Sequence, residues 1–196
     1  MAEAQDALSL GNAYSAVSKL RDLDEAERWF ERSLGLRAES DRLGRATSLG
    51  SIGSIALRRF DDANTAGETE PVLLKHLNAA ERRYQQALEL FGADDHENRA
   101  ITEHQLGNIY NRVGDSRQAL RHYQQAIKHD EARGAIYEAG RARYNVALVL
   151  ADDGQYGNSL LYARAALGNL QQVGPGAAAE ADRVRWLIAE LEQRNR

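Results

Sequence analysis

Apolar and small side chains recur along this chain at the three- and four-residue spacings of amphipathic helices. In residues 105–127, Leu106, Gly107 and Tyr110 lie on one face of a predicted helix. A second predicted helix follows, with its own stripe formed by Ala119, Tyr123, Ala126 and Ile127. Between them, Gly114 suits a helix C-terminus, and Asp115 or Ser116 suits the next N-cap. The stretch therefore predicts a helical hairpin.

The same order of small, aromatic and apolar positions recurs in three further copies. The first consists of Leu10, Gly11, Tyr14, Ala26, Phe30, Ser33 and Leu34. The second consists of Ile52, Gly53, Ala56, Ala80, Tyr84, Ala87 and Leu88. The last and weakest consists of Val146, Ala147, Leu150, Ser159, Ala163, Ala166 and Leu167. Hairpins repeated in tandem bury their apolar faces against their neighbours, so the pattern predicts an all-α solenoid.

We expect a single solenoid domain over residues 1–196, with a capping helix at its C-terminal end. The predicted hairpins span approximately residues 3–38, 42–92, 97–132 and 136–172. The capping helix is predicted over 177–194 from the apolar stripe Val184, Leu187, Ile188 and Leu191. An insertion at 61–75 interrupts the second hairpin. It admits two interpretations, a partly disordered surface loop or a contact arm at the edge of the solenoid.

Gly107 is an unexpected residue for a helix interior, because glycine costs about 1 kcal/mol there relative to alanine. We expect this cost to be offset by close contact between the two helices of the hairpin. The predicted contact joins Gly107 to the stripe of Ala119 and Ala126.

The spacing L-G-x2-Y, followed by A-x3-F/Y-x2-A, resembles the tetratricopeptide repeat. The third copy, "LGNIY" followed by "ALRHYQQAI", meets this pattern in full. The resemblance implies a right-handed superhelical solenoid of antiparallel helix hairpins. The repeats are longer than the minimal unit of about 34 residues. This long form resembles kinesin light chains, Leu-Gly-Asn-type adaptors and the sensor arms of bacterial STAND-class signalling proteins, and residues 133–167 most resemble the last group.

Charge and composition narrow the classes of partner. The formal net charge is −4, and there is no cysteine for a disulfide, a thiolate metal site or a cysteine nucleophile. We therefore expect no nucleic-acid partner, since such partners favour basic surfaces. No apolar run approaches the ~20 residues of a membrane span, and "MAEAQDALSL" lacks the features of a signal peptide. These features predict a cytoplasmic protein with no membrane partner.

No arrangement of residues in the sequence predicts catalysis. The histidines His76, His96, His104, His122 and His129 include no H-E-x-x-H or i, i+4 pair. The acidic cluster from Asp94 to Glu97 is interpreted as a solvated loop with an N-cap. The glycines of "SLGSIGSIA" lack the lysine and the preceding strand of a phosphate-binding loop. We expect no cofactor, no metal and no enzymatic activity.

The resemblance also implies a concave groove lined by the first helix of each hairpin. The residue after each packed glycine turns about 100° around its helix and is expected to face this groove. The expected groove residues are Leu8, Asn12, Ser15, Ser54, Leu57, Arg58, His104, Asn108, Asn111, Arg112, Arg141, Tyr144, Leu148 and Asp152. Asn12 and Asn108 occupy equivalent positions, where an amide suits a peptide backbone. A carboxylate clamp for chaperone tails is a poor match, because Leu8 stands where that pattern has lysine.

These features predict a non-enzymatic scaffold that binds a peptide or protein segment in its groove. One alternative is a regulatory or sensor arm of a larger bacterial signalling protein, either a STAND ATPase or a protease-linked one. It rests on the abrupt start of the first repeat and on the STAND-like last repeats. An enzyme is the weakest alternative and would depend on His104 or His122.

Overall fold

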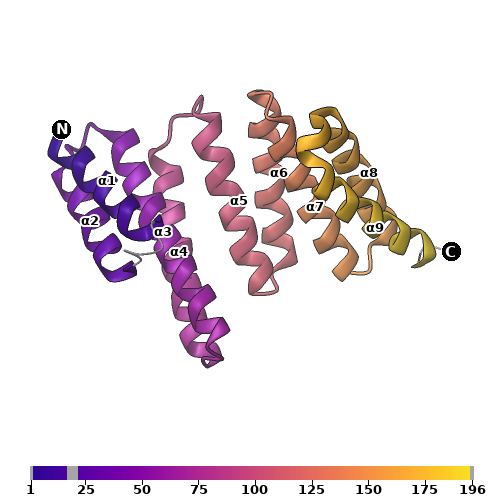
Figure 1. Cartoon of the computed structure of the whole chain (residues 1–196), viewed down its shortest axis with the longest axis horizontal. Helices are drawn as coiled ribbons and strands as arrows, with labels where there is room; N and C mark the ends of the chain where they lie inside the picture. Colours follow the sequence, from indigo (N-terminus) through magenta and orange to yellow (C-terminus); the bar gives the residue numbers. More distant parts are fainter. Residues whose placement is uncertain (1, 17–21, 195–196) are drawn as a thin grey trace. The chain divides into compact units, whose positions relative to one another are not determined.

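The computed structural model describes residues 2–16 and 22–194, and every regular element in this part of the chain is helical (Figure 1). The chain divides into two compact units, Met1–Ala93 and Asp94–Arg196. Unit 1 contains α1 (Ala2–Ala16), α2 (Leu23–Leu36), α3 (Arg42–Thr65) and α4 (Glu70–Leu90). Unit 2 contains α5 (His96–Arg112), α6 (Ser116–Ala132), α7 (Ile136–Asp152), α8 (Tyr156–Val173), a 3-10 turn (Gly174–Ala177) and α9 (Ala178–Arg194). The predicted all-α class is confirmed.

Within each unit, every helix packs against the next one along the chain. The hairpins are α1–α2 and α3–α4 in unit 1, and α5–α6 and α7–α8 in unit 2. Contacts of α2 with α3, and of α6 with α7, join the successive hairpins. The C-terminal helix α9 packs on α8 through Ala181, Val184, Leu187 and Leu191. This sequential packing is the arrangement that the repeated apolar stripes predict.

The turns of the third hairpin follow from local backbone chemistry. Gly114 has a φ of +78°, and its amide donates to Asn111 at 3.1 Å, so it ends α5 in the left-handed conformation expected. Asp115 then caps α6 by accepting from the amide of Gln118 at 3.0 Å. Asp22, Asp41 and Asp95 cap α2, α3 and α5 in the same way.

The insertion at 61–75 does not form a loop. Helix α3 runs to Thr65, α4 begins at Glu70, and only a short turn around Gly67, with a φ of +73°, separates them. The turn projects beyond the rest of unit 1 (Figure 1). The partly disordered loop is therefore the wrong interpretation, because the extra residues lengthen both helices of the hairpin. Pro71 fits this arrangement, since proline is tolerated in the first turn of a helix.

The atoms nearest to the side-chain position of Gly107 belong to an aromatic ring and not to the alanines that we expected. A Cβ atom at Gly107 would lie 2.6 Å from two carbons of the Tyr123 ring. A Cβ atom at Gly11 would likewise lie 2.5 Å from the Phe30 ring, and one at Gly53 would lie 3.2 Å from the Tyr84 ring. Ala119 and Ala126 are also buried, but in the core that α6 shares with α7. The missing Cβ therefore makes room for the aromatic side chain of the second helix.

Candidate functional site

Two adjoining hollows lie along helices α5, α7 and α9 of unit 2, and we call them the α5–α7 hollow and the α7–α9 hollow. The α5–α7 hollow, of about 170 Å³, is lined by Ala100, Ile101, His104, Gln105, Asn108, Asp130, Arg133, Glu138 and Arg141. The α7–α9 hollow, of about 400 Å³, is lined by Tyr137, Arg141, Tyr144, Asn145, Leu170, Glu180, Arg183 and Val184. Arg141 lines both, so together they form one polar surface with aromatic side chains.

The structure brings four of the expected groove residues to these hollows. They are His104, Asn108, Arg141 and Tyr144. Asn111 and Arg112, also expected there, are exposed near the end of α5 and line neither hollow. Leu148 is half-buried and Asp152 is exposed on α7.

The expected residues of unit 1 divide between buried and exposed positions. Leu8, Ser15 and Leu57 are buried, so their assignment to an open groove is wrong. Leu8 lies in a core with Phe30 of α2 and with Ile52 of α3, because this face of α1 covers neighbouring helices. Asn12 and Arg58 are exposed, and a guanidinium N–H of Arg58 donates to the backbone oxygen of Ser15.

Asn108 has a structural partner that the sequence pattern did not reveal. The buried Tyr123 hydroxyl donates to Asn108 Oδ1 at 2.8 Å, and Asn108 Nδ2 donates to Gln105 Oε1 at 3.3 Å. In unit 1 the equivalent Ser54 hydroxyl lies 2.9 Å from the Tyr84 hydroxyl. Burial raises the pKa of Tyr84 to about 12, and it also raises that of Tyr123. Where the aromatic residue is Phe30, which has no hydroxyl, Asn12 is exposed. In these two hairpins the residue after the glycine thus forms a hydrogen bond with the tyrosine hydroxyl.

We expect Asn108→Ala to lower the free energy of unfolding by about 1 kcal/mol or more, because it leaves the Tyr123 hydroxyl without its acceptor. In a Tyr123→Phe background the same change should cost less, since no hydroxyl remains to be satisfied. Urea unfolding of the wild type, both single variants and the double variant measures this coupling. Equal costs of Asn108→Ala in the two backgrounds would rule out the hydrogen bond as a stabilising contact.

His104 is held in its neutral form between α5 and α7. Burial, together with the positive charge of Arg141, lowers its pKa to about 4. Asn145 Nδ2 lies 2.8 Å from His104 Nε2, so the amide donates to the unprotonated ring nitrogen. The ring also meets Tyr123 edge to face, with centroids 5.5 Å apart. These contacts fix the ring in place, and His104 lines the α5–α7 hollow.

Charges along the two hollows are partly paired. Two N–H groups of Arg133 donate to Asp130 Oδ1 at 3.1 and 3.0 Å, although burial still raises the pKa of Asp130. Arg141 is exposed, has no ion-pair partner among residues 2–16 and 22–194, and lies 5.9 Å from the ring centre of Tyr137. A cation beside tyrosine rings is available to a partner's carboxylate or carbonyl groups.

Several lining residues were missed at the sequence level. Tyr137 lies one helical turn before Arg141, so extending the predicted stripe of α7 toward its N-terminus would have found it. Glu180 and Arg183 lie on α9, which the sequence predicted only as a cap. Asn145 follows Tyr144 directly and was missed because only packing shows that it reaches His104.

His122, His96 and His129 each contact another side chain of unit 2. His122 is buried, bonded to Glu103 Oε2 at 2.6 Å and stacked on Tyr110 with ring centres 5.1 Å apart. His96 and His129 meet through their Nδ1 atoms at 3.0 Å. Within the described residues, no group of three or more His, Cys, Asp or Glu side chains has the geometry to hold a metal. None of the described helices is long and apolar enough to cross a membrane.

Comparison with known proteins agrees with the fold of repeated helical hairpins. Sequence profiles of the tetratricopeptide repeat match residues 7–45 and 73–132. The structure of BtubC (BKLC) from P. vanneervenii is similar with a TM-score of 0.75, at 12% identity over 99% of this chain and 80% of that one. A structure of MamA is similar with a TM-score of 0.63, at 20% identity over 86% of this chain and 79% of that one.

At these identities the two structures show a shared fold alone. No curated protein matches the chain in sequence. The resemblance to STAND-class sensor arms and to kinesin light chains therefore stays a prediction. The two matched segments, the helical hairpins and the related folds together identify the chain as a tetratricopeptide repeat protein.

Proposed function

We propose that this protein is a non-enzymatic interaction scaffold that binds a peptide segment of a partner protein along α5, α7 and α9. The observation that carries the proposal is the shared lining of the two hollows around Arg141. There an exposed guanidinium lies between Tyr137 and Tyr144 on one side and the polar side chains of α5 on the other. Tyrosine and arginine are the side chains that dominate many protein interfaces.

The bonding capacity of the lining suits a peptide backbone. One N–H of the Asn108 amide remains after its bond to Gln105, and Gln105 and Asn145 add further amide groups at the same surface. The aromatic faces of Tyr137 and Tyr144 provide apolar area at a low cost in side-chain entropy. Such a surface recognises main-chain groups and one or more side chains of an extended or helical segment.

Arg141→Ala is the variant that tests the proposal with least disturbance to the fold, since the Arg141 side chain is exposed. Peptides selected from a random-sequence display library on the wild-type protein should bind this variant at least about tenfold more weakly, as expected for an arginine at the centre of an interface. Binding is measured by fluorescence anisotropy with the full chain.

Arg121→Ala is the matched control, because Arg121 is an exposed arginine of α6 that lines neither hollow. It should bind the selected peptides as the wild type does. Equal binding by the wild type and Arg141→Ala would contradict the groove assignment. A failure to select any peptide that depends on α5, α7 or α9 would contradict the scaffold proposal itself.

A further inference from the structure

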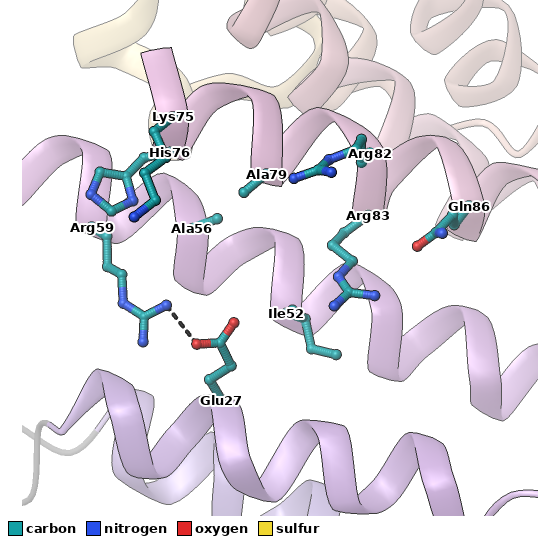
Figure 2. A pocket seen from close by; sticks show the side chains of 10 residues that line it. All are labelled: Glu27, Ile52, Ala56, Arg59, Lys75, His76, Ala79, Arg82, Arg83 and Gln86. Carbon is teal, nitrogen blue, oxygen red and sulfur yellow. Dashed lines mark hydrogen bonds and ion pairs between the residues drawn. The ribbon is translucent and has the colours of Figure 1, made fainter. Parts of the chain in front are cut away.

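A separate pocket lies between α2, α3 and α4 of unit 1, and we call it the α4 pocket (Figure 2). Its volume is about 510 Å³. Four cationic side chains line it, together with one carboxylate, that of Glu27. The cations are Arg59, Lys75, Arg82 and Arg83. In a protein with a net charge of −4, this is a local concentration of positive charge.

Two of these cations form ion pairs with carboxylates of the protein, and two do not. Arg59 donates to Glu27 at 2.5 Å and to Asp24 at 2.6 Å, and Arg83 lies 3.5 Å from Glu31. Lys75 and Arg82 have no ion-pair partner in the described part of the chain. Burial lowers the pKa of the neighbouring His76, and the charges of Arg59 and Lys75 lower it further, which is the effect of a positive local field.

The apolar part of the surface lies beside these charges. Ile52, Ala56 and Ala79 line the α4 pocket between the cationic groups (Figure 2). On the other side of Lys75 and Arg82, a second hollow is lined by Pro71, Leu74, Asn78 and Glu81, and Leu74 is exposed. The Glu81 carboxylate accepts from Gln85 Nε2 at 2.9 Å. The two cations therefore lie in a row along α4 with apolar surface on both sides.

The helical extension at 61–75 contributes Lys75 to the α4 pocket, and Pro71 and Leu74 to the neighbouring hollow. Lys75 belongs to the extra turns of α4, and His76 follows it directly, opposite Arg59 of the lengthened α3. Lys75 and Arg82 are seven residues apart, so two helical turns, or about 10 Å, separate their positions on one face of α4. A partner with two carboxylates at that separation engages both cations at once.

We propose that the α4 pocket and the neighbouring hollow bind an acidic segment of a partner protein in which Asp or Glu side chains alternate with apolar ones. The carboxylates pair with Lys75 and Arg82, and an apolar side chain lies on Ile52, Ala56 and Ala79. A small anion would use the cations alone and leave this apolar floor uncovered. The surface is distinct from the groove of α5, α7 and α9, and the inference does not depend on that groove.

The test uses the full chain and three labelled peptides of one length, composed of Glu and Leu, of Gln and Leu, or of Glu and Ser. The Glu-Leu peptide should bind at least about tenfold more tightly than the Gln-Leu peptide, because charge-assisted hydrogen bonds are lost with glutamine. It should also bind more tightly than the Glu-Ser peptide, because serine has no apolar side chain to bury against the apolar floor. Binding should raise the pKa of His76, followed by NMR, since a bound carboxylate offsets the neighbouring positive charges.

Lys75→Gln/Arg82→Gln should weaken Glu-Leu binding at least about tenfold, since both hydrogen-bonding cations are removed. Arg121→Gln/Lys128→Gln is the matched control, because it removes one arginine and one lysine from exposed positions of α6. This control and Arg141→Ala should bind the peptide as the wild type does.

Four results would overturn the proposal. The first is no binding of the Glu-Leu peptide, and the second is unchanged binding of this peptide by Lys75→Gln/Arg82→Gln. The third is loss of binding in Arg141→Ala. The fourth is equal binding of the Glu-Ser and Glu-Leu peptides together with full competition by inorganic phosphate. The last result would show a simple anion site. Loss in Arg141→Ala would place the peptide in the groove instead, so failure here is distinguishable from failure of the scaffold function.

Discussion

Gly107→Leu is expected to lower the free energy of unfolding by about 3 kcal/mol, at the upper end of the usual cost of overpacking a core. The added Cβ would lie 2.6 Å from the Tyr123 ring, and the rest of the leucine side chain needs still more of that space. The ring has little freedom to move, because its hydroxyl is bonded to Asn108 and it makes a T-shaped contact with the His104 ring. Urea unfolding of the variant and the wild type measures the difference.

Gly168→Ala is the control for this substitution. Gly168 also lies inside a helix of unit 2, but a Cβ there would meet no atom within 4 Å. Its replacement by alanine should raise stability by about 0.5–1 kcal/mol, since alanine has the higher helix propensity. If Gly107→Leu unfolded like the wild type, the packing of α5 on α6 described above would be wrong.

Stability is expected to fall by about 3 kcal/mol through His104 alone as the pH drops from near 7 to about 4. The pKa of His104 in the folded protein is about 4, well below the 6.5 of an unburied histidine. Between these two values the unfolded chain binds a proton at this position and the folded chain does not, so acid favours unfolding. Above 6.5 the histidine is neutral in both states, and the contribution to stability is fully present.

His104→Gln isolates this contribution, because a glutamine side chain keeps a group that can accept from Asn145 and does not titrate. Its stability should depend less steeply on pH between about 6.5 and 4 than that of the wild type, measured by urea unfolding across the range. His76→Gln should change the slope less, since His76 is much less deeply buried than His104. Parallel pH profiles of the wild type and His104→Gln would show that the ring is not protected from protonation.

The hairpins were predictable because their signals are local. Gly114 and Asp115 end one helix and begin the next through bonds to residues three or four positions away. The apolar stripes repeat with the period of the helix itself, so the faces that pack can be read without knowledge of the partner helix. The insertion was harder to assign, because its polar residues and its glycine and proline are typical of a loop. Those residues instead occupy the exposed end of two long helices and the turn between them.

The groove was predictable only in part. The residue after the packed glycine lies about 100° around the helix, and the face that passes through it was predicted to line the groove. On α5 this prediction selected His104 and Asn108, and both line the α5–α7 hollow. It also selected Leu8 and Leu57, which are buried, because a helix in the middle of a packed array has neighbours on more than one side. The α4 pocket was not predicted from the sequence, since its cations come from two helices and Arg59 of α3 lies sixteen or more residues from Lys75, Arg82 and Arg83 of α4.

The sequence by itself determined the helices, the residues that end and cap the helices of the third hairpin, the hairpin repeat and the glycines Gly11, Gly53 and Gly107 at the helix contacts. All of these depend on bonds and periodicities within a few residues of one another. Only the tertiary structure decided that Gly107 makes room for Tyr123, that Asn108 partners its hydroxyl, and that Lys75 and Arg82 lie beside an apolar floor. Those relations depend on how one helix is placed and rotated against another, and side-chain packing across the interface fixes this placement.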